Sequence, residues 1–270
     1  MALYYGKIMS CTVECIIRQH KTCQGDGSGR HDGLKNRCPK GHEGSTPSPG
    51  TKKYMPFWSS DTAYAIGLIT TDGNLSKDRR HISLTSTDKR LLQTFKKCLH
   101  INNRICRNPS LSFSKKQCFK VTFGNVAFYK KLLMIGLMPN KTFKLGALKI
   151  PNKYMPDFLR GHIDGDGSII RYMDKHNKYK NKIYTYNRLY IALHSASLRH
   201  IIWIRQVIYR NLNIKGSLSG WRDSKRKNTK THWTLRFCAR ESSILIPYLY
   251  YKKGLPCLRR KRNIALSFLS

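Results

Sequence analysis

The chain has 270 residues, of which 51 are Lys or Arg and 14 are Asp or Glu, so its formal net charge at pH 7 is +37. Hydrophobic residues make up 40% of it, enough for a core, and no apolar run is long enough for a membrane-spanning helix. Glu14 interrupts the apolar N-terminal stretch and no small-residue cleavage site follows, so we expect no signal peptide and an intracellular protein. Basic residues along the whole chain favour nucleic acid as the partner.

The N-terminal segment differs in composition from the remainder. Residues 1–56 contain nine Lys or Arg and four Asp or Glu, which leaves 42 and 10 for residues 57–270, a net charge of +32 there. Residues 24–50 are rich in Gly, Ser, Pro, His and Lys and have no apolar period, so we expect a low-order extension. A zinc module is a weaker alternative, because the spacing lacks paired C-x2-C ligands. Its cysteines would be Cys11, Cys15, Cys23 and Cys38.

A second hypothesis about this segment concerns translation. Gly44-Ser45-Thr46-Pro47 can be encoded by GGT-TCG-ACT-CC, the usual T-arm sequence of a transfer RNA gene, and residues 32–37 can encode an anticodon stem and loop. In that case residues 1–54 come from a reading frame that crosses such a gene, and Met55 is the start.

From residue 57 onward, apolar periodicity and capping residues predict the same order of elements twice: helix, strands, helix, strands, helix. The first set comprises helix 61–71, strand 81–85, a helix capped by Asp88, strand 119–123 and a helix from Asn125 to Gly136. The second set comprises helix 157–164, strand 189–193, helix 197–212, strand 233–237 and helix 242–251. This duplication predicts an α+β fold of two halves, residues 57–150 and 151–270, with pseudo-two-fold symmetry.

The first helix of each half carries the same nine-residue pattern. Residues 65–73 are AIGLITTDG and residues 159–167 are LRGHIDGDG, with Gly third, Ile fifth, Asp eighth and Gly ninth in both. Glycine inside a helix costs about 1 kcal/mol relative to Ala, which close packing of the two helices would explain for Gly67 and Gly161. We expect the ninth-position glycines to close each helix in a left-handed conformation. They are Gly73 and Gly167.

The eighth-position acids, Asp72 and Asp166, are the candidate catalytic residues, and they lie 94 residues apart. Carboxylates are disfavoured at helix C-termini, and two that lie side by side cannot both ionise without a cation, which a divalent metal supplies. The other acids after residue 56 have simpler interpretations. We expect Asp61, Asp88 and Asp157 to cap helices, Asp164 to lie off the metal-facing side, and His162 to be a core or interface histidine.

These patterns resemble the motifs of LAGLIDADG homing endonucleases. The second copy keeps most of the motif, whereas the first departs from it at Ala65, Thr70 and Thr71. The segments Lys141-Thr142 and Ile150-Pro151 and a basic helix from Leu258 also resemble the family. The resemblance spans about residues 57–269 and implies two αββαββα halves in one chain, with the motif helices at their interface and the sheets forming a saddle over DNA.

The resemblance also implies an activity. It is the site-specific cleavage of both DNA strands, with Mg²⁺ or Mn²⁺ held by Asp72 and Asp166 together with Gly73 and Gly167. Two basic residues are candidates for stabilising the transition state, namely Lys120 and Arg240. Basic residues of the predicted strands and their turns would face phosphates and base edges; they are Arg79, Lys120, Arg188, Arg222 and Arg236.

The expected partner is double-stranded DNA with a long, partly asymmetric target, bound by a monomer in a bacterial cytoplasm or in an organelle that contains a genome. An alternative is an RNA maturase, in which the same scaffold assists the splicing of intron RNA without cleaving DNA. A transcription regulator ranks last, because residues 1–56 lack the paired apolar helices of a helix-turn-helix.

Overall fold

The computed structural model describes residues 57–108, 117–179, 182–222 and 230–269. All of them belong to one unit, Tyr54–Ser270. The hypotheses about residues 1–56, namely a low-order extension, a zinc module or a transfer RNA gene, lie outside the described residues. The domain boundaries at residues 56 and 150 stay predictions.

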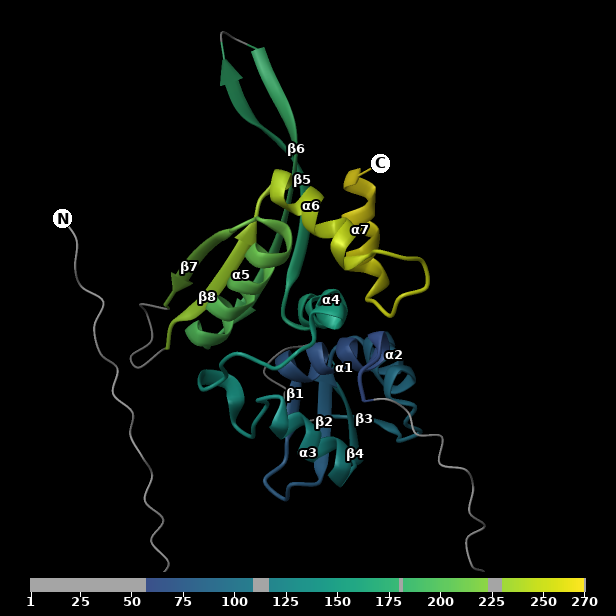
Figure 1. Cartoon of the computed structure of the whole chain (residues 1–270). Helices are drawn as coiled ribbons and strands as arrows, with labels where there is room; N and C mark the ends of the chain where they lie inside the picture. Colours follow the sequence, from purple (N-terminus) through teal and green to yellow (C-terminus); the bar gives the residue numbers. More distant parts are fainter. Residues whose placement is uncertain (1–56, 109–116, 180–181, 223–229, 270) are drawn as a thin grey trace, which may run out of the picture. The chain divides into compact units, whose positions relative to one another are not determined.

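Each half of this unit contains the same series of elements (Figure 1). The first half consists of α1 (Ser60–Thr71), β1 (Gly73–Leu75), β2 (His81–Ser86), α2 (Lys89–Leu99), β3 (Ile105–Arg107), β4 (Phe119–Gly124) and α3 (Val126–Met134), followed by the 3₁₀ helix η2 (Lys141–Phe143). The second half follows the 3₁₀ helix η3 (Asn152–Tyr154) and consists of α4 (Met155–Gly165), β5 (Ser168–Tyr179), β6 (Lys182–Ser195), α5 (Leu198–Leu212), β7 (Ser217–Trp221), β8 (His232–Phe237), α6 (Ala239–Leu249) and α7 (Arg259–Leu269).

The sheets confirm the duplication. Each half contains a four-stranded antiparallel sheet, with the orders β1-β2-β4-β3 and β5-β6-β8-β7. The pairings are also equivalent, because the next-to-last residue of β2, Thr85, pairs with Lys120, and the next-to-last residue of β6, His194, pairs with Thr234. Strands β5 and β6 form the longest of the described strand pairs, and the end of β5 and the start of β6 extend beyond the rest of their sheet (Figure 1). The chain therefore has the predicted α+β fold of two like halves.

One face of each sheet is buried under helices, because the strands alternate apolar and polar residues. The buried residues of the inner strands are Ile82, Leu84, Val121 and Phe123 in the first half, and Ile191, Leu193, Leu235 and Phe237 in the second. Strands β1, β3, β5 and β7 were not predicted. Strands β1, β3 and β7 have three to five residues, which is too short to display an alternating pattern.

Caps fix several helix ends, though not all where the sequence suggested. Asp88 and Asn125 cap α2 and α3 as predicted, with side chains that accept from Arg90 N and Phe128 N at 2.9 Å. The cap of α1 is Ser59, which accepts from Thr62 N at 3.0 Å, so the prediction of Asp61 was wrong. The prediction that Asp157 caps α4 was also wrong, because the residue preceding α4 is Tyr154.

Helices α1 and α4 pack against each other backbone to backbone at the junction of the halves (Figure 1). A Cβ atom on Gly67 would lie 2.2 Å from the carbonyl oxygen of Phe158, and one on Gly161 would lie 2.1 Å from that of Tyr64. No side chain fits at either position. The prediction that these glycines permit close packing of the motif helices is confirmed.

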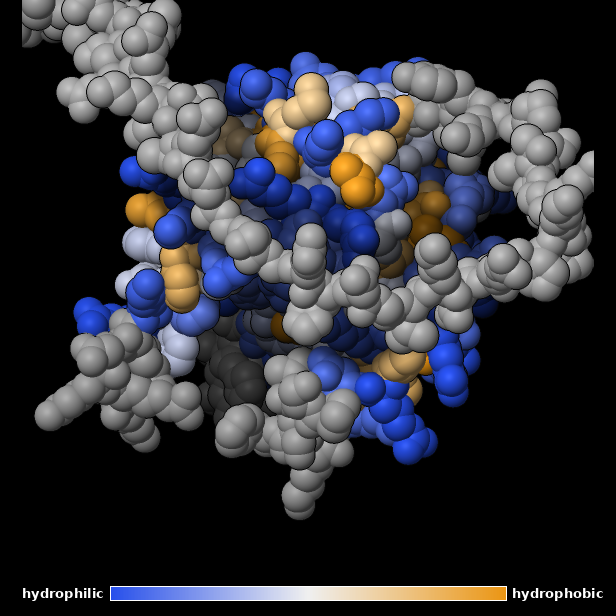
Figure 2. Space-filling model, turned by 90° about the horizontal axis from the view of Figure 1, so that it is seen from below, coloured by the Kyte–Doolittle hydropathy of each residue, from blue (hydrophilic) through white to orange (hydrophobic). Residues whose placement is uncertain are grey.

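The face of the molecule shown in Figure 2 is predominantly polar. Figure 2 shows mainly hydrophilic residues on one face of the molecule, with hydrophobic residues in separate patches. No helix among the described residues has the length and apolar character needed to cross a membrane.

Candidate active site at the ends of the motif helices

The packing of α1 against α4 brings their C-terminal acids together. Asp72 and Asp166 are the C-terminal cap residues of α1 and α4, with closely similar backbone angles of φ −88° and −86°. Asp72 is half-buried and Asp166 is exposed, and their carboxyl groups are within hydrogen-bonding reach of each other. The side-by-side placement inferred from the glycines is therefore present.

The contact between the two acids is electrostatically strained. The pKa of Asp72 is raised from 3.8 to about 7, first by burial and then by the charge and the hydrogen-bonding contact of Asp166. Lys261 and Lys141 act in the opposite direction. A carboxyl pair that resists double ionisation near neutral pH is a place where a divalent cation would bind favourably.

Two lysines that the sequence analysis did not single out as site residues lie at the helix ends. The Nζ atom of Lys141 donates to the carbonyl oxygens of Thr71, at 3.4 Å, and of Gly73. The Nζ atom of Lys261 donates to those of Gly165 and Gly167 at 3.4 and 2.8 Å. These carbonyls occupy equivalent positions, so the lysines form a pseudo-symmetric pair that satisfies unpaired helix carbonyls and opposes the negative end of each helix dipole.

Burial lowers the pKa of both lysines, that of Lys261 to about 8, and the two aspartates partly oppose this effect. Only a weak signal in the sequence marks these two lysines. Lys141 belongs to a segment that resembles the family, and Lys261 belongs to the basic C-terminal helix, but neither is at a fixed distance from its motif.

The ninth-position glycines serve a different purpose from the one expected. Neither Gly73 nor Gly167 has a left-handed φ, so the prediction of a left-handed helix end was wrong. A Cβ atom on Gly73 would lie 2.5 Å from the Cα of Ile69, and one on Gly167 would lie 2.6 Å from that of Ile163. Glycine is needed because the chain turns directly from helix into strand and passes close over the preceding helical turn.

The donors near the acid pair suit a hard cation. Among the residues that the structure describes, no group of three or more His, Cys, Asp or Glu side chains is arranged to hold a metal ion. Mg²⁺ binds through one or two carboxylates, retains several waters, and takes further oxygens from substrate phosphates. Asp72 and Asp166 match that requirement. The carbonyls of Gly73 and Gly167 each accept a lysine hydrogen bond, and a carbonyl oxygen has two lone pairs.

Two cavities flank the acid pair at equivalent places in the two halves. One, of about 330 Å³, is lined by Asp166, Lys141 and Thr71. The other, of about 420 Å³, is lined by Asp72 and Gly165. Each cavity therefore contains one of the two acids. We call each cavity with its acid a half-site, that of Asp72 or that of Asp166.

The walls of these cavities differ in chemistry. The cavity beside Asp166 is lined by four histidines, namely His162, His194, His200 and His232. The wall of the other cavity has Thr85, Leu91 and Cys118 at the places that correspond to His194, His200 and His232. The fold is duplicated, but the two half-sites are chemically unlike.

His162 is buried, as predicted, but only partly hydrogen-bonded. Its Nε2 lies 3.3 Å from the Nε2 of His200, whose Nδ1 donates to Gly146 O at 2.9 Å. The Nδ1 of His162 has no partner in the described part of the chain. Burial lowers the pKa of both rings, that of His200 to about 4, so both are neutral at physiological pH.

Four of the five residues expected to contact DNA lie on strands or at strand ends, facing away from the core. Lys120, Arg188 and Arg236 occupy positions opposite to the buried ones on β4, β6 and β8, and Arg222 directly follows β7. Arg79 is exposed in the β1–β2 turn. Two make contacts within the sheet: the guanidinium of Arg188 lies 3.3 Å from Asp174, and that of Arg236 lies over the Tyr190 ring. Their roles in binding stay predictions.

The two candidate transition-state cations lie in different surroundings. Lys120 is half-buried on the outer face of β4, whereas Arg240 is exposed in the first turn of α6. The cations that act on the pKa of Asp72 are Lys261 and Lys141. The assignments of Lys120 and Arg240 stay predictions, with the lysine pair as an additional candidate.

Comparisons with known proteins agree with this geometry. Residues 59–105 match the family model of a LAGLIDADG-like domain. The homing endonuclease I-WcaI, solved bound to its DNA recognition sequence, superposes with a TM-score of 0.52 at 12% identity, over 79% of this chain and 89% of that one. The LAGLIDADG homing endonuclease I-LtrWI, solved bound to target DNA, gives 0.49 at 15% identity, over 77% and 89%.

A third solved structure, full-length DUF199/WhiA from Thermatoga maritima, gives a TM-score of 0.45 at 15% identity, over 79% of this chain and 63% of that one. No curated protein matches the sequence. At 12% identity the match to I-WcaI shows the fold alone, and the family model covers the first motif helix and the elements that follow it. Residues 59–105 thus resemble a LAGLIDADG-like domain, and the chain shares its fold with the homing endonuclease I-WcaI.

Proposed function

We propose that this protein is a site-specific, metal-dependent endonuclease that cleaves both strands of a DNA duplex. The observation that carries the proposal is the pair of acids, Asp72 and Asp166, in contact at the ends of two packed helices, with the pKa of Asp72 raised to about 7. A structural role does not require two mutually repelling carboxylates there, whereas a divalent cation between them would relieve the repulsion.

Each acid serves one half-site in this proposal. The carboxylates of Asp72 and Asp166 hold the cation, with the carbonyls of Gly73 and Gly167 as further ligands. A bound Mg²⁺ or Mn²⁺ supplies an activated water and offsets charge on the phosphate. Lys141 and Lys261 add positive charge beside the same phosphates, where it favours the transition state.

DNA is the proposed partner, and charge supports this choice. Residues 57–270 have a net charge of +32, and the outer faces of both sheets carry basic residues. I-WcaI, which shares the fold, is described as a homing endonuclease bound to its DNA recognition sequence. The unlike walls of the two cavities favour a target whose two halves differ in sequence. We propose that a monomer binds it, because one chain supplies both half-sites.

The test begins by selecting bound duplexes from a randomised DNA library and cloning the enriched sequence into a plasmid. Cleavage is then followed as conversion of supercoiled plasmid to linear product with Mg²⁺, with Ca²⁺ or with a chelator. We expect linear product with Mg²⁺ alone and binding in all three conditions. Selection of no duplex would contradict the proposal. Tight binding of the host intron RNA without any DNA cleavage would favour the maturase.

A further inference from the structure

The two lysines beside the acid pair are held by different parts of the chain. Lys141 lies in η2, directly in the connection between the halves. Lys261 lies in the first turn of α7, and its Nζ also donates to the carbonyls of Ile163 and Asp164, at 2.6 and 3.0 Å. In the described part of the first half, η2 is the element that follows the last α-helix α3, whereas in the second half α7 follows α6. The position of Lys261 therefore depends on how the start of α7 is held beside the end of α4.

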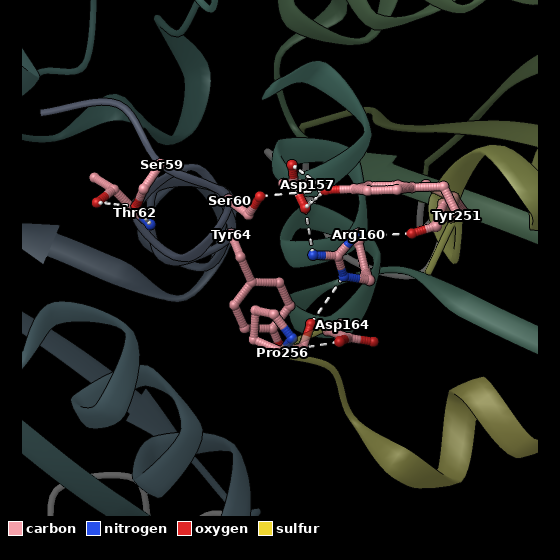
Figure 3. Close-up of polar contacts among 10 residues, drawn as sticks. Ser59, Ser60, Thr62, Tyr64, Asp157, Arg160, Asp164, Tyr251 and Pro256 are labelled. Carbon is pink, nitrogen blue, oxygen red and sulfur yellow. Dashed lines mark hydrogen bonds and ion pairs between the residues drawn. The ribbon is translucent and has the colours of Figure 1, made fainter. Parts of the chain in front are cut away.

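Asp164 makes that connection. Its Oδ2 accepts from the backbone N–H of Leu258, at 2.7 Å, and from the hydroxyl of Tyr64, at 2.8 Å. Leu258 directly precedes α7, so one buried carboxylate oxygen joins α4, α1 and the start of α7. Figure 3 shows Tyr64 and Asp164 side by side between the motif helices. Three residues beyond Leu258, Lys261 reaches the end of α4.

Arg160 fixes the connection that leads into α7. Its Nη1 donates to Leu249 O and its Nε to Pro256 O, both at 2.8 Å. Its Nη2 is 2.6 Å from the carboxylate of Asp157, which also accepts from Tyr251 at 3.2 Å. Leu249 ends α6 and Pro256 lies two residues before Leu258, so one buried guanidinium holds both ends of the α6–α7 connection (Figure 3).

This network is present in one half only. The positions 94 residues earlier in α1 are Ala63, Ile66 and Thr70, in place of Asp157, Arg160 and Asp164. The Thr70 hydroxyl donates within its own helix, to Ile66 O at 2.8 Å. Apolar residues thus suffice for stable packing at two of these positions, and buried ion pairs seldom stabilise a fold more than apolar residues would. The charged network is therefore better explained by the positioning of α7 than by stability.

We propose that Asp164, supported by Arg160, is a positioning residue for Lys261 and thereby controls cleavage of one DNA strand. This inference rests on the proposed endonuclease function. The cavity beside Asp72 is lined by Leu258 and Arg260 of the same segment, whereas Lys141 lines the cavity beside Asp166. Loosening α7 would disturb the wall of the cavity beside Asp72, and the wall beside Asp166 contains no residue of α7.

The first experiment needs no DNA. Reductive methylation of the full chain, read by mass spectrometry, compares Lys261 with Lys141, whose exposed fractions are 4% and 9%. Asp164→Ala should raise the labelling rate of Lys261 about tenfold, through local opening of α7, and leave that of Lys141 unchanged. Asp164→Asn keeps an oxygen that can accept from Leu258 and should retain protection.

If Asp164→Ala does not fold, a milder variant, Tyr64→Phe, with a matched control still tests the inference. Tyr64→Phe removes one of the two hydrogen bonds to Asp164 and should raise the labelling of Lys261 less than Asp164→Ala does. Tyr129→Phe is the matched control, because its hydroxyl is likewise buried and donates to Ser76 O at 2.6 Å in the first half. It should leave the labelling of Lys261 unchanged.

The second experiment identifies the strand that each variant fails to cut, on a plasmid that carries the selected target. Asp164→Ala should produce nicked plasmid, with cleavage of one strand slowed about 100-fold by displacement of Lys261 and DNA binding unchanged. The uncut strand should be the one that Lys261→Met also leaves uncut, and Lys141→Met should leave the opposite strand uncut. Asp164→Asn should still linearise the plasmid.

Several results would overturn the inference. If Lys261 stays protected from methylation in Asp164→Ala, Asp164 does not position it. The positioning role is also excluded if Asp164→Ala slows cleavage of both strands equally, or if the strand that it leaves uncut differs from the one that Lys261→Met leaves uncut. An unmutated protein that binds but does not cut DNA would instead contradict the proposed function. The labelling comparison would then still decide whether Asp164 positions Lys261.

Discussion

Gly67 and Gly161 lie against each other where α1 crosses α4. A Cβ atom on Gly67 would lie 2.9 Å from the Cα of Gly161, and one on Gly161 would lie 3.2 Å from the Cα of Gly67. The approach of these two backbones sets the distance between the helices and hence the distance between Asp72 and Asp166 at their ends. The geometry of the site therefore depends on two residues that have no side chain.

The first prediction concerns these glycines. Gly67→Ala and Gly161→Ala each place a methyl group against backbone atoms that cannot yield, so each should cost about 3 kcal/mol or more in the free energy of unfolding. The gain of about 1 kcal/mol in helix propensity does not offset this. Gly146→Ala is the control, because a Cβ there meets nothing within 4 Å, and it should be nearly neutral. Urea unfolding measures all three, and a Gly67→Ala protein as stable as the parent would contradict the packing.

The second prediction concerns the acid pair. Asp72→Asn and Asp166→Asn keep the shape of the side chain but remove a charged metal ligand. Binding to the target should persist or tighten slightly, because repulsion of phosphate falls. Cleavage should fall by several orders of magnitude, since each 1.36 kcal/mol in the barrier is about tenfold in rate. Gel shifts and Mg²⁺-dependent linearisation separate the two effects. Full cleavage by either variant would exclude the proposed mechanism.

The third prediction is a pH dependence of stability without divalent metal. Because the pKa of Asp72 is raised from 3.8 to about 7, the folded state binds this proton more tightly than the unfolded state does. The resulting stabilisation is complete below pH 3.8 and is lost as the pH rises through 7. Asp72→Asn lacks this titration, so its stability relative to the parent should increase between pH 4 and pH 8.

Thermal unfolding of both proteins in a chelating buffer gives this difference directly, because titrations common to both cancel. Adding Mg²⁺ should restore the stability of the parent at pH 8 and have little effect on Asp72→Asn. A stability difference that does not change with pH would show that the two carboxyls do not interact in solution.

The fourth prediction concerns DNA affinity and salt. Binding through phosphates should weaken with salt, with log K falling by about 0.9 per contact for each unit of log salt concentration. Arg236→Gln, on the outer face of β8, should reduce this slope by about one contact. Arg199→Gln is the control, because Arg199 is also exposed but lies on α5, which covers the other face of the sheet. Equal slopes for the two variants would place the DNA elsewhere.

The sequence by itself determined the duplication, the motif helices and the two acids. These features depend on local periodicity, on caps such as Asp88 and Asn125, and on a nine-residue pattern that occurs twice. Even the contact between Asp72 and Asp166 could be inferred, because a glycine inside a helix has few explanations other than close packing.

Only the tertiary structure decided which other groups join the acids. Lys141 and Lys261 reach equivalent carbonyls from elements that differ in kind and in distance along the chain, so no spacing rule could pair them. Asp157 was expected to cap a helix, but it lies buried inside α4, where Arg160 of the same helix pairs with it and Tyr251 of the α6–α7 connection donates to it. Asp164 acquires its role from Leu258, the residue directly before α7 and 94 residues away, whose N–H donates to it. Local sequence fixes which residues end a helix, whereas the burial of a charge and its partners depend on segments that meet only in the folded chain.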